Sequence, residues 1–381
     1  MGNRTKLAVR PLALVALVAS FVVCAEDQKG AFNDDRVANL EPLAIHPRTS
    51  LTIVDQIRHN HFVKKPLDDA ASSEIFDKYV NTLDPGHAYL LKTDLDALNN
   101  YRYQLDEALK HGDLKPAFAI YNTFRGRLLD RLDSLVVRLE EGVEKFTFES
   151  EDELQLDRDT APWPENEAAS DALWERRLKA SILSMKLNER DLDDIQDVLL
   201  KRYRNRLKQA QKTRPEDAFQ LYINAFASTY DPHTQYLSPR SSENFNMSMS
   251  LSLQGIGAVL RTEDDYTSVV RLVTAGPADK AGELRPSDRI VSVGQGERGK
   301  LIDVVGWRLD DVVELIRGPK GTIVRLGLVD NSGDEESGRV IQIKRDTVKL
   351  EEQAAQKKVF TLESEVGDVR IGVVDIPTFY V

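Results

Sequence analysis

A change of hydrophobic period near residue 247 most constrains the fold of this chain. From Thr49 to about Tyr230, apolar residues recur every three to four positions, which predicts amphipathic helices. After residue 247, short runs rich in β-branched residues alternate with glycine-containing turns, which predicts strands. The sequence therefore predicts an all-helical domain, residues 49–239, followed by a smaller domain of mixed helices and strands, residues 240–346.

Several element boundaries can be predicted inside these two regions. The first region is expected to hold a long helix and, after prolines that interrupt the helical pattern, three more helices: 116–146, 166–187, 189–212 and 215–230. The second is expected to hold five strands, a short helix opened by Pro277 and a longer helix: strands 257–261, 268–273, 289–293, 323–329 and 339–345, with the longer helix at 308–317.

The turn Gly255-Ile256-Gly257 is the clearest candidate for a binding site. Glycine tolerates the positive φ angles at which backbone amides converge, and such a nest can bind a carboxylate. The strand that follows would offer an open edge to an extended peptide. The helix at 309–317 carries an apolar stripe that would wall the groove, although the pattern leaves open which members face the groove and which face the core. The predicted binding residues are Gly255, Ile256, Gly257, Ala258, Val259, Leu260, Leu309, Val312, Val313 and Ile316.

The first 25 residues form a separate segment. Three basic residues precede a 13-residue apolar run, residues 11–23, and residues 23–25 have the spacing of a cleavage site. Thirteen apolar residues are too few to cross a bilayer, so we expect a cleavable secretory signal peptide, with an uncleaved membrane anchor as the alternative. The only cysteine, Cys24, would leave with it, which fits a bacterial periplasm. Residues 26–48 are polar and are expected to be poorly ordered.

Other patterns exclude or weaken several functions. The formal net charge of −11 argues against general nucleic-acid binding, and we expect membrane association to be peripheral at most. The glycines of 294–300 resemble a phosphate loop, but Leu301 stands where a magnesium-binding hydroxyl is needed, so a glycine-rich hairpin is expected. His59 and His61 are a weak basis for a metal site, and His233 is expected to help cap a turn. We therefore expect no metal and no cofactor.

Longer blocks of sequence carry a family resemblance. Together they are similar to the N-terminal part of the tail-specific proteases, also called C-terminal processing peptidases, of Gram-negative bacteria. The blocks are DRDTAPWP at 157–164, YDPHTQYLSP at 230–239, MSLSLQGIGAVL at 249–260, GWRLDDVV at 306–313, GPKG at 318–321 and VVDIPTFYV at 373–381.

The resemblance implies a PDZ domain at 240–346, and then a connection and the first strand of a protease core at 347–381. It implies a periplasmic serine endopeptidase that recognises the apolar free C-terminus of protein substrates through this domain. In the family the serine nucleophile and lysine base follow the strand that here ends at Val381, so this chain is expected to hold the recognition half without the catalytic dyad. The alternatives are a non-catalytic PDZ peptide-binding module and the product of a truncated gene. The helical domain would either cradle the PDZ domain or dock a periplasmic or lipoprotein adaptor.

The resemblance also assigns roles to single residues. The positions 255–258 match the carboxylate-binding turn, and Val259 and Leu260 match the strand that pairs with the substrate. One departure concerns the turn before the central strand, where such PDZ domains usually have Gly-Asp and this chain has Ser287 and Asp288. If that turn needs a positive φ angle, Ser287 is strained by roughly 1 kcal/mol.

Overall fold

The computed structural model describes residues 38–148, 153–330, 338–349, 354–363 and 368–377. The predicted signal peptide and the first part of the segment expected to be poorly ordered, residues 26–37, lie outside them. In the rest of that segment, the Leu40 amide donates to Asn122 Oδ1 at 2.9 Å and Asn122 Nδ2 donates to the Leu40 carbonyl at 3.0 Å. These two bonds hold the backbone of Leu40, and the first helix begins at His46, so the last residues of the segment are helical. The degree of order of the segment stays a prediction.

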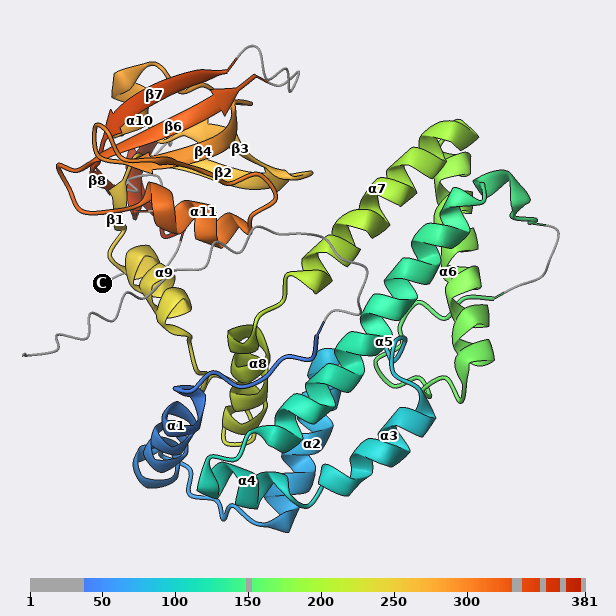
Figure 1. Cartoon of the computed structure of the whole chain (residues 1–381). Helices are drawn as coiled ribbons and strands as arrows, with labels where there is room; N and C mark the ends of the chain where they lie inside the picture. Colours follow the sequence, from blue (N-terminus) through green and yellow to red (C-terminus); the bar gives the residue numbers. More distant parts are fainter. Residues whose placement is uncertain (1–37, 149–152, 331–337, 350–353, 364–367, 378–381) are drawn as a thin grey trace, which may run out of the picture. The chain divides into compact units, whose positions relative to one another are not determined.

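The first region is helical, as predicted. It contains α1 (His46–Asn60), α2 (Asp69–Leu83), α3 (Lys92–Leu98), α4 (Leu105–His111), α5 (Lys115–Glu140), α6 (Glu167–Leu187), α7 (Leu192–Gln211) and α8 (Pro215–Ala227), with 3₁₀ turns at Asn99–Tyr101 and Val143–Lys145 (Figure 1). The four helices that the sequence specified are present with slightly shorter bounds. By length and hydropathy, none of the helices within the described residues could cross a membrane.

The long helix α5 connects two hydrophobic cores. Its first half buries Phe118 and Phe124 in a core shared with α1, α2, α4 and α8. Its second half buries Leu132 and Leu139 in a core shared with α6 and α7. The helix can serve both cores because its apolar residues recur at the 3.6-residue period over 26 residues.

The second region is built on antiparallel sheets. Its elements are α9 (Pro239–Met249), β1 (Ser252–Gly255), β2 (Ala258–Glu263), β3 (Tyr266–Leu272), α10 (Pro277–Ala281), β4 (Arg289–Gln295), β5 (Leu301–Asp303), α11 (Leu309–Ile316), β6 (Ile323–Val329), β7 (Arg339–Lys344) and β8 (Asp346–Lys349). The main sheet has the order β2-β3-β4-β6-β7, and β5 pairs with β4. All five predicted strands and both predicted helices are confirmed. The β4–β5 pairing of Gly294 with Leu301 also confirms the glycine-rich hairpin.

Two elements at the border of this region carry no clear local signal. The helix α9 has no buried residue, and β8 is a short polar strand. The strand β8 pairs with β1 in the register Ser252 to Lys349, far apart along the chain. The predicted connection beginning at residue 347 is therefore wrong at its start, because residues 347–349 complete this pair.

The last described elements form a hairpin. The strand β10 (Val369–Asp375) lies in the segment where the sequence analysis expected the first strand of a protease core, and it pairs along its full length with β9 (Gln356–Leu362). A strand is therefore present there, and its place in a protease core stays a prediction. Every residue of the two strands is exposed, including Phe360 and Val374.

Candidate peptide-binding furrow

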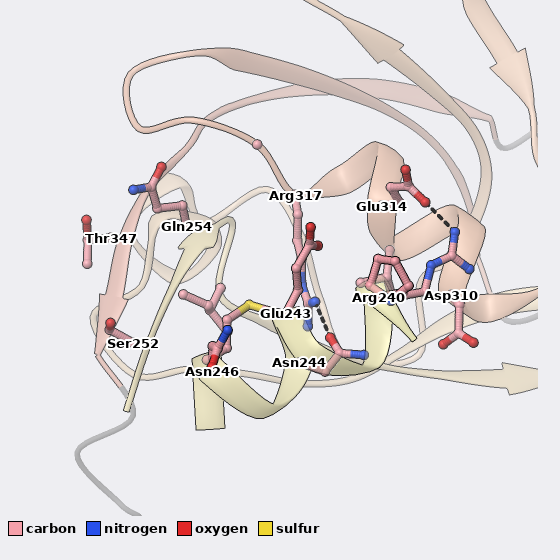
Figure 2. A pocket seen from close by; sticks show the side chains of 15 residues that line it. Arg240, Glu243, Asn244, Asn246, Ser252, Gln254, Asp310, Glu314, Arg317 and Thr347 are labelled. Atoms are coloured by element: carbon pink, nitrogen blue, oxygen red, sulfur yellow. Dashed lines mark hydrogen bonds and ion pairs between the residues drawn. The ribbon is translucent and has the colours of Figure 1, made fainter. Parts of the chain in front are cut away.

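A furrow of about 860 Å³ lies between α9, β1 and α11. The helix α9 contributes Arg240 and Asn244, the strand β1 contributes Leu253, and the helix α11 contributes Val313. Arg317, which follows α11, projects into the same space in Figure 2. The furrow therefore combines an apolar wall with charged and amide side chains.

The apolar stripe of α11 divides between the core and the furrow. Val312 is 0% exposed and Ile316 is 3% exposed, and both pack in the core of the second region. Val313 lines the furrow, whereas Leu309 is half-buried and does not line it. Val312 and Ile316 therefore face the core, because a helix turns 100° per residue, and this settles a division that the sequence left open. Contact of the stripe with a ligand stays a prediction.

The predicted turn is held by its carbonyl groups. The Gly257 carbonyl accepts from the Val273 amide at 2.8 Å, and the Ile256 carbonyl accepts from the Ala278 amide at 2.8 Å. Among the described residues, the amides of Ile256 and Gly257 donate to no carbonyl. Gly257 has a φ angle of +73° and lies against the Cα of Gly276, so a side chain at this position would meet both strain and crowding. The carboxylate-binding role of the turn stays a prediction.

Among the strands that the structure describes, β2 lies at the edge of the main sheet and pairs with β3 alone. Its first residue, Ala258, and its third, Leu260, pack against the core, whereas the side chain of Val259 between them is partly exposed. An edge strand has unpaired backbone donors and acceptors along its outer side. This is the property that the sequence analysis required of a strand that pairs with a peptide.

A buried arginine, Arg345, closes the C-terminal end of α11. Its guanidinium donates to the carbonyl of Ile316 at 2.8 Å and to that of Leu315 at 2.9 Å. It also reaches Gln295 Oε1 at 2.6 Å and Thr322 Oγ1 at 2.9 Å. Burial lowers the pKa of Arg345. The last carbonyls of a helix lack partners within the helix and carry its negative end, so a buried cation stabilises them.

The helix α9 is tied to α11 by charged side chains. Arg240 donates to Asp311 Oδ1 at 3.0 Å. Arg240 also pairs with Glu314, as Figure 2 shows. Burial acts to raise the pKa of Asp311, but hydrogen bonds from Arg214 and Arg240 outweigh it and hold that pKa below its ordinary value. Arg317 Nη1 donates to Asn244 Oδ1 at 2.7 Å. Sequence reasoning missed Arg240, Arg317 and Arg345, because a single arginine inside a helix, or next to the end of a helix or strand, gives no periodic signal.

The predicted turn around His233 is confirmed. Asp231 Oδ1 accepts from the His233 amide at 2.8 Å, and Asp231 Oδ2 accepts from the Thr234 hydroxyl. Hydrogen bonding, above all from Thr234, lowers the pKa of Asp231. His61 is mostly buried, with Nε2 3.0 Å from Thr234 Oγ1. Over the residues that the structure describes, no three metal-binding side chains gather as a metal ion would require.

The fold and the furrow define a class of protein in which an all-helical domain is followed along the chain by a PDZ domain. Residues 244–329 match the PDZ domain family, and residues 53–240 match the family described as the tail-specific protease N-terminal domain. The chain belongs to the tail-specific protease family.

Two relatives agree with this assignment. The tail-specific protease of Haemophilus influenzae is 40% identical over 327 residues, which cover 86% of this chain and 46% of that protein. The carboxy-terminal processing protease CtpA of Bacillus subtilis is 35% identical over 150 residues, which cover 39% of this chain and 28% of that protein. A crystal structure of the PDZ domain of a carboxy-terminal protease from Vibrio cholerae in complex with peptide is 51% identical and covers 26% of this chain and 100% of its own, with a TM-score of 0.25. The chain thus spans less than half the length of either relative.

Proposed function

We propose that this chain binds the free C-terminal end of other polypeptides in the furrow beside α11. The last residues of the peptide would extend along the outer edge of β2, which does not itself line the furrow, and an apolar final side chain would enter the furrow and contact Val313 and Leu253. The observation that carries the proposal is the edge position of β2, next to a turn whose amides at Ile256 and Gly257 have no carbonyl acceptor among the described residues. Backbone pairing would supply affinity, and the apolar wall would supply selectivity.

We propose further that the whole protein is a serine endopeptidase that cuts the substrates held in this way. The names of the relatives, a tail-specific protease and a carboxy-terminal processing protease, support this activity. The two matched regions of this chain are a helical domain and a PDZ domain, so the polypeptide printed here would recognise substrates and leave them uncut. The periplasm is the proposed location, on the basis of the N-terminal segment 1–25. An adaptor that docks on the helical domain is a proposed partner.

Peptide titration tests the binding proposal. Fluorescein-labelled decapeptides that end in Ala-Ala-Leu would be compared with the same peptides carrying a C-terminal amide or a final aspartate. The amide removes a charge-assisted contact worth roughly 1.5–3 kcal/mol, so its affinity should fall by about 10- to 100-fold. Equal affinity for acid and amide peptides would contradict the proposal.

A variant pair locates the site. Val313→Asp places a charge in the furrow and should abolish binding of the apolar-ended peptide. Val305→Asp is the matched control, because Val305 is an exposed residue of the same region outside the furrow. Equal loss in both variants would argue against this furrow as the site.

Two simpler assays test the remaining parts. Incubation of the chain with an unfolded protein ending in apolar residues should give no cleavage products by mass spectrometry. Cleavage that a serine-directed inhibitor blocks would contradict the proposed division between recognition and chemistry. Expression in a Gram-negative bacterium should give a protein released by osmotic shock whose N-terminus begins after Ala25, and retention of residues 1–25 would favour a membrane anchor.

A further inference from the structure

A cavity of about 520 Å³ lies in the helical region, beside the first half of α6. The helix contributes Ala169, Leu173 and Arg176, whose spacing places them on one face of it. The segment before α6 contributes Arg158 and residues 162–165, and Lys92 at the start of α3 also lines the cavity. None of these residues lines the furrow of the PDZ domain, so the two sites are separate.

The wall formed by the segment before α6 is held in place by its neighbours. The Trp163 ring stacks on His87, with ring centroids 3.8 Å apart and planes 21° apart. The Pro164 carbonyl accepts from the Lys92 amide at 2.8 Å. Proline also fixes the φ angle at positions 162 and 164. The cavity therefore has a preformed apolar wall, and a ligand would bind it without ordering the backbone first.

Arg158 is oriented by backbone carbonyls. Its Nε donates to the Gly86 carbonyl at 3.0 Å, and its Nη2 donates to the His87 carbonyl at 3.0 Å. The same Nη2 also donates to the Pro162 carbonyl at 3.3 Å. Among the described residues Nη1 has no acceptor and the guanidinium has no carboxylate partner. Arg158 is thus a fixed cation that lines the cavity with donors to spare.

The charges around Arg158 are mostly of the same sign. Arg176 is half-buried, and its guanidinium forms no ion pair or hydrogen bond in the described part of the chain. Burial lowers the pKa of Arg158, and Arg177 and Arg176 lower it too, whereas Asp84 acts to raise it. The Asp84 carboxylate is 1% exposed and already accepts from the amides of residues 88–90. It therefore cannot move into the cavity.

The acidic residues of this part of α6 are engaged elsewhere. Glu167, Asp171 and Glu175 lie one turn apart and pair with arginines of α5. The acidic residue that lines the cavity, Glu165, pairs with Lys92 at 3.7 Å between two exposed side chains, a contact that contributes little. In a chain with a net charge of −11, this cavity is a local exception, with two guanidiniums that lack a counter-charge.

We propose that this cavity binds an acidic segment of a partner protein, with a carboxylate on Arg158 and Arg176 and an adjoining apolar side chain against Trp163. A guanidinium binds a carboxylate through two parallel hydrogen bonds. The site takes side-chain carboxylates and needs no free C-terminus, so the inference goes beyond the end-binding proposed for the furrow. A nucleic acid or an anionic membrane fits less well, because the net charge of −11 repels an extended polyanion and a flat surface does not enter a cavity.

Peptide binding to the whole chain tests the proposal. The probe is a fluorescein-labelled peptide of alternating aspartate and leucine with a C-terminal amide, which the furrow would not hold. The matched peptide has asparagine in place of aspartate. The acidic peptide should bind about 10-fold more tightly or better, and its affinity should fall as salt is added. Equal affinity for the two peptides, or no binding of either, would overturn the proposal.

A pair of charge reversals locates the site. Arg176→Glu should lower the affinity for the acidic peptide by about 10- to 100-fold. Arg48→Glu is the matched control, because Arg48 is exposed on α1, lies outside the cavity and forms no ion pair among the described residues. It changes the net charge equally and should leave the affinity within about two-fold. An equal loss in both variants would mean that only the net charge acts, which overturns the site.

Further variants separate binding from folding. Arg176→Lys should recover part of the affinity, because it keeps the charge without the planar guanidinium. Peptide-resolved hydrogen exchange shows whether α6 stays protected in Arg176→Glu. If protection is lost, Arg176→Gln repeats the test, since it removes the charge without adding an acid. Full affinity in Arg176→Gln would overturn the role of Arg176.

Competitors and a second peptide distinguish the remaining outcomes. Displacement of the acidic peptide by phosphatidylglycerol vesicles or single-stranded DNA, lost in Arg176→Glu, would overturn the choice of a protein segment. A peptide with a free Ala-Ala-Leu end should bind wild-type protein and Arg176→Glu alike. If that peptide fails to bind either protein, the furrow proposal fails and the cavity result stands. If Arg176→Glu weakens both peptides equally, the cavity is not a separate site.

Discussion

The helical region and the PDZ domain bury different kinds of side chain in their cores. The helical core is aromatic, and Tyr79, Phe219, Tyr222 and Phe226 are all fully buried there. The core cluster of the PDZ domain consists of aliphatic residues. Four of the six non-glycine residues with a positive φ angle in the described chain also lie in or next to this domain: Leu251, Asp264, Ala275 and Ser287. The helical region therefore holds two of the six residues with a positive φ angle, whereas the PDZ domain and its border hold the other four. The furrow lies in the PDZ domain as well.

This difference predicts that stability and recognition can be changed separately. Changes in the helical core should alter unfolding with no effect on peptide affinity. Within the PDZ domain, neighbouring residues should divide between the two properties, because some face the sheet and others face the furrow.

Phe226→Ala should have the largest effect on stability. Phe226 is fully buried in the first helical core and packs edge-on against Tyr230. Its removal leaves a cavity and should lower the free energy of unfolding of the helical region by about 3–5 kcal/mol. Denaturant unfolding followed by peptide-resolved hydrogen exchange would measure this. Phe62→Ala is the control, because Phe62 is 97% exposed. If Phe226→Ala also lowers the affinity for the peptide, stability of the helical region and peptide recognition are not separate.

Arg345→Met should destabilise the PDZ domain by about 2–4 kcal/mol. The change leaves the last carbonyls of α11 and the side chain of Gln295 without their buried donor. Loss of hydrogen-exchange protection at β4, β6 and α11 would be the readout. Lys344→Met, at an exposed neighbouring position, should change little. If Arg345→Met leaves the midpoint of denaturant unfolding unchanged, water replaces the guanidinium with no loss of unfolding free energy.

Val312→Ala and Val313→Ala give the sharpest test within one helix. Val312 is fully buried, so its truncation should cost about 2 kcal/mol of stability. Val313 lines the furrow, so its truncation should lower the affinity for an apolar-ended peptide several-fold with little loss of stability. Thermal unfolding and peptide titration on both variants would measure the division. The opposite pattern would reverse the orientation assigned to α11.

Ser287→Gly should stabilise the PDZ domain by about 0.5–1 kcal/mol. Ser287 has a φ angle of +71°, so the condition that the sequence analysis set for strain at this turn is met. Glycine adopts this angle at no steric cost, whereas the control Ser287→Ala keeps the Cβ atom and should gain nothing. We expect Ser287→Gly, and not Ser287→Ala, to raise the midpoint of thermal unfolding above that of the wild-type protein. Equal midpoints for the three proteins would show that the turn relaxes around serine.

Elements with a strong period could be predicted from the sequence, and elements defined by distant partners could not. The apolar residues of α5 and the β-branched runs of β3 and β6 repeat at fixed intervals, so local reasoning found them. The strand β8 exists because it pairs with β1, almost a hundred residues away. The polar helix α9 is held by the ion pairs of Arg240. Neither contact leaves a local pattern.

The residues of the furrow could likewise be predicted only in part from the sequence. The sequence placed the turn at Gly257 from the backbone freedom of glycine, and the family resemblance raised a positive φ angle at Ser287 as a condition; both angles are positive in the structure. It could not divide the α11 stripe, since Val312 and Val313 are adjacent and equally apolar. It also missed Arg317, whose position depends on how the end of α11 meets the turn at Gly255.

The β9–β10 hairpin has a consequence for handling the protein. A two-stranded ribbon is marginally stable alone in water, and this one leaves Val359, Leu362, Ile371 and Val374 in contact with solvent. Such a ribbon gains stability only when another surface covers it. Light scattering should therefore report a particle size that grows with protein concentration, and polypeptides that stop at Lys349 should stay monodisperse.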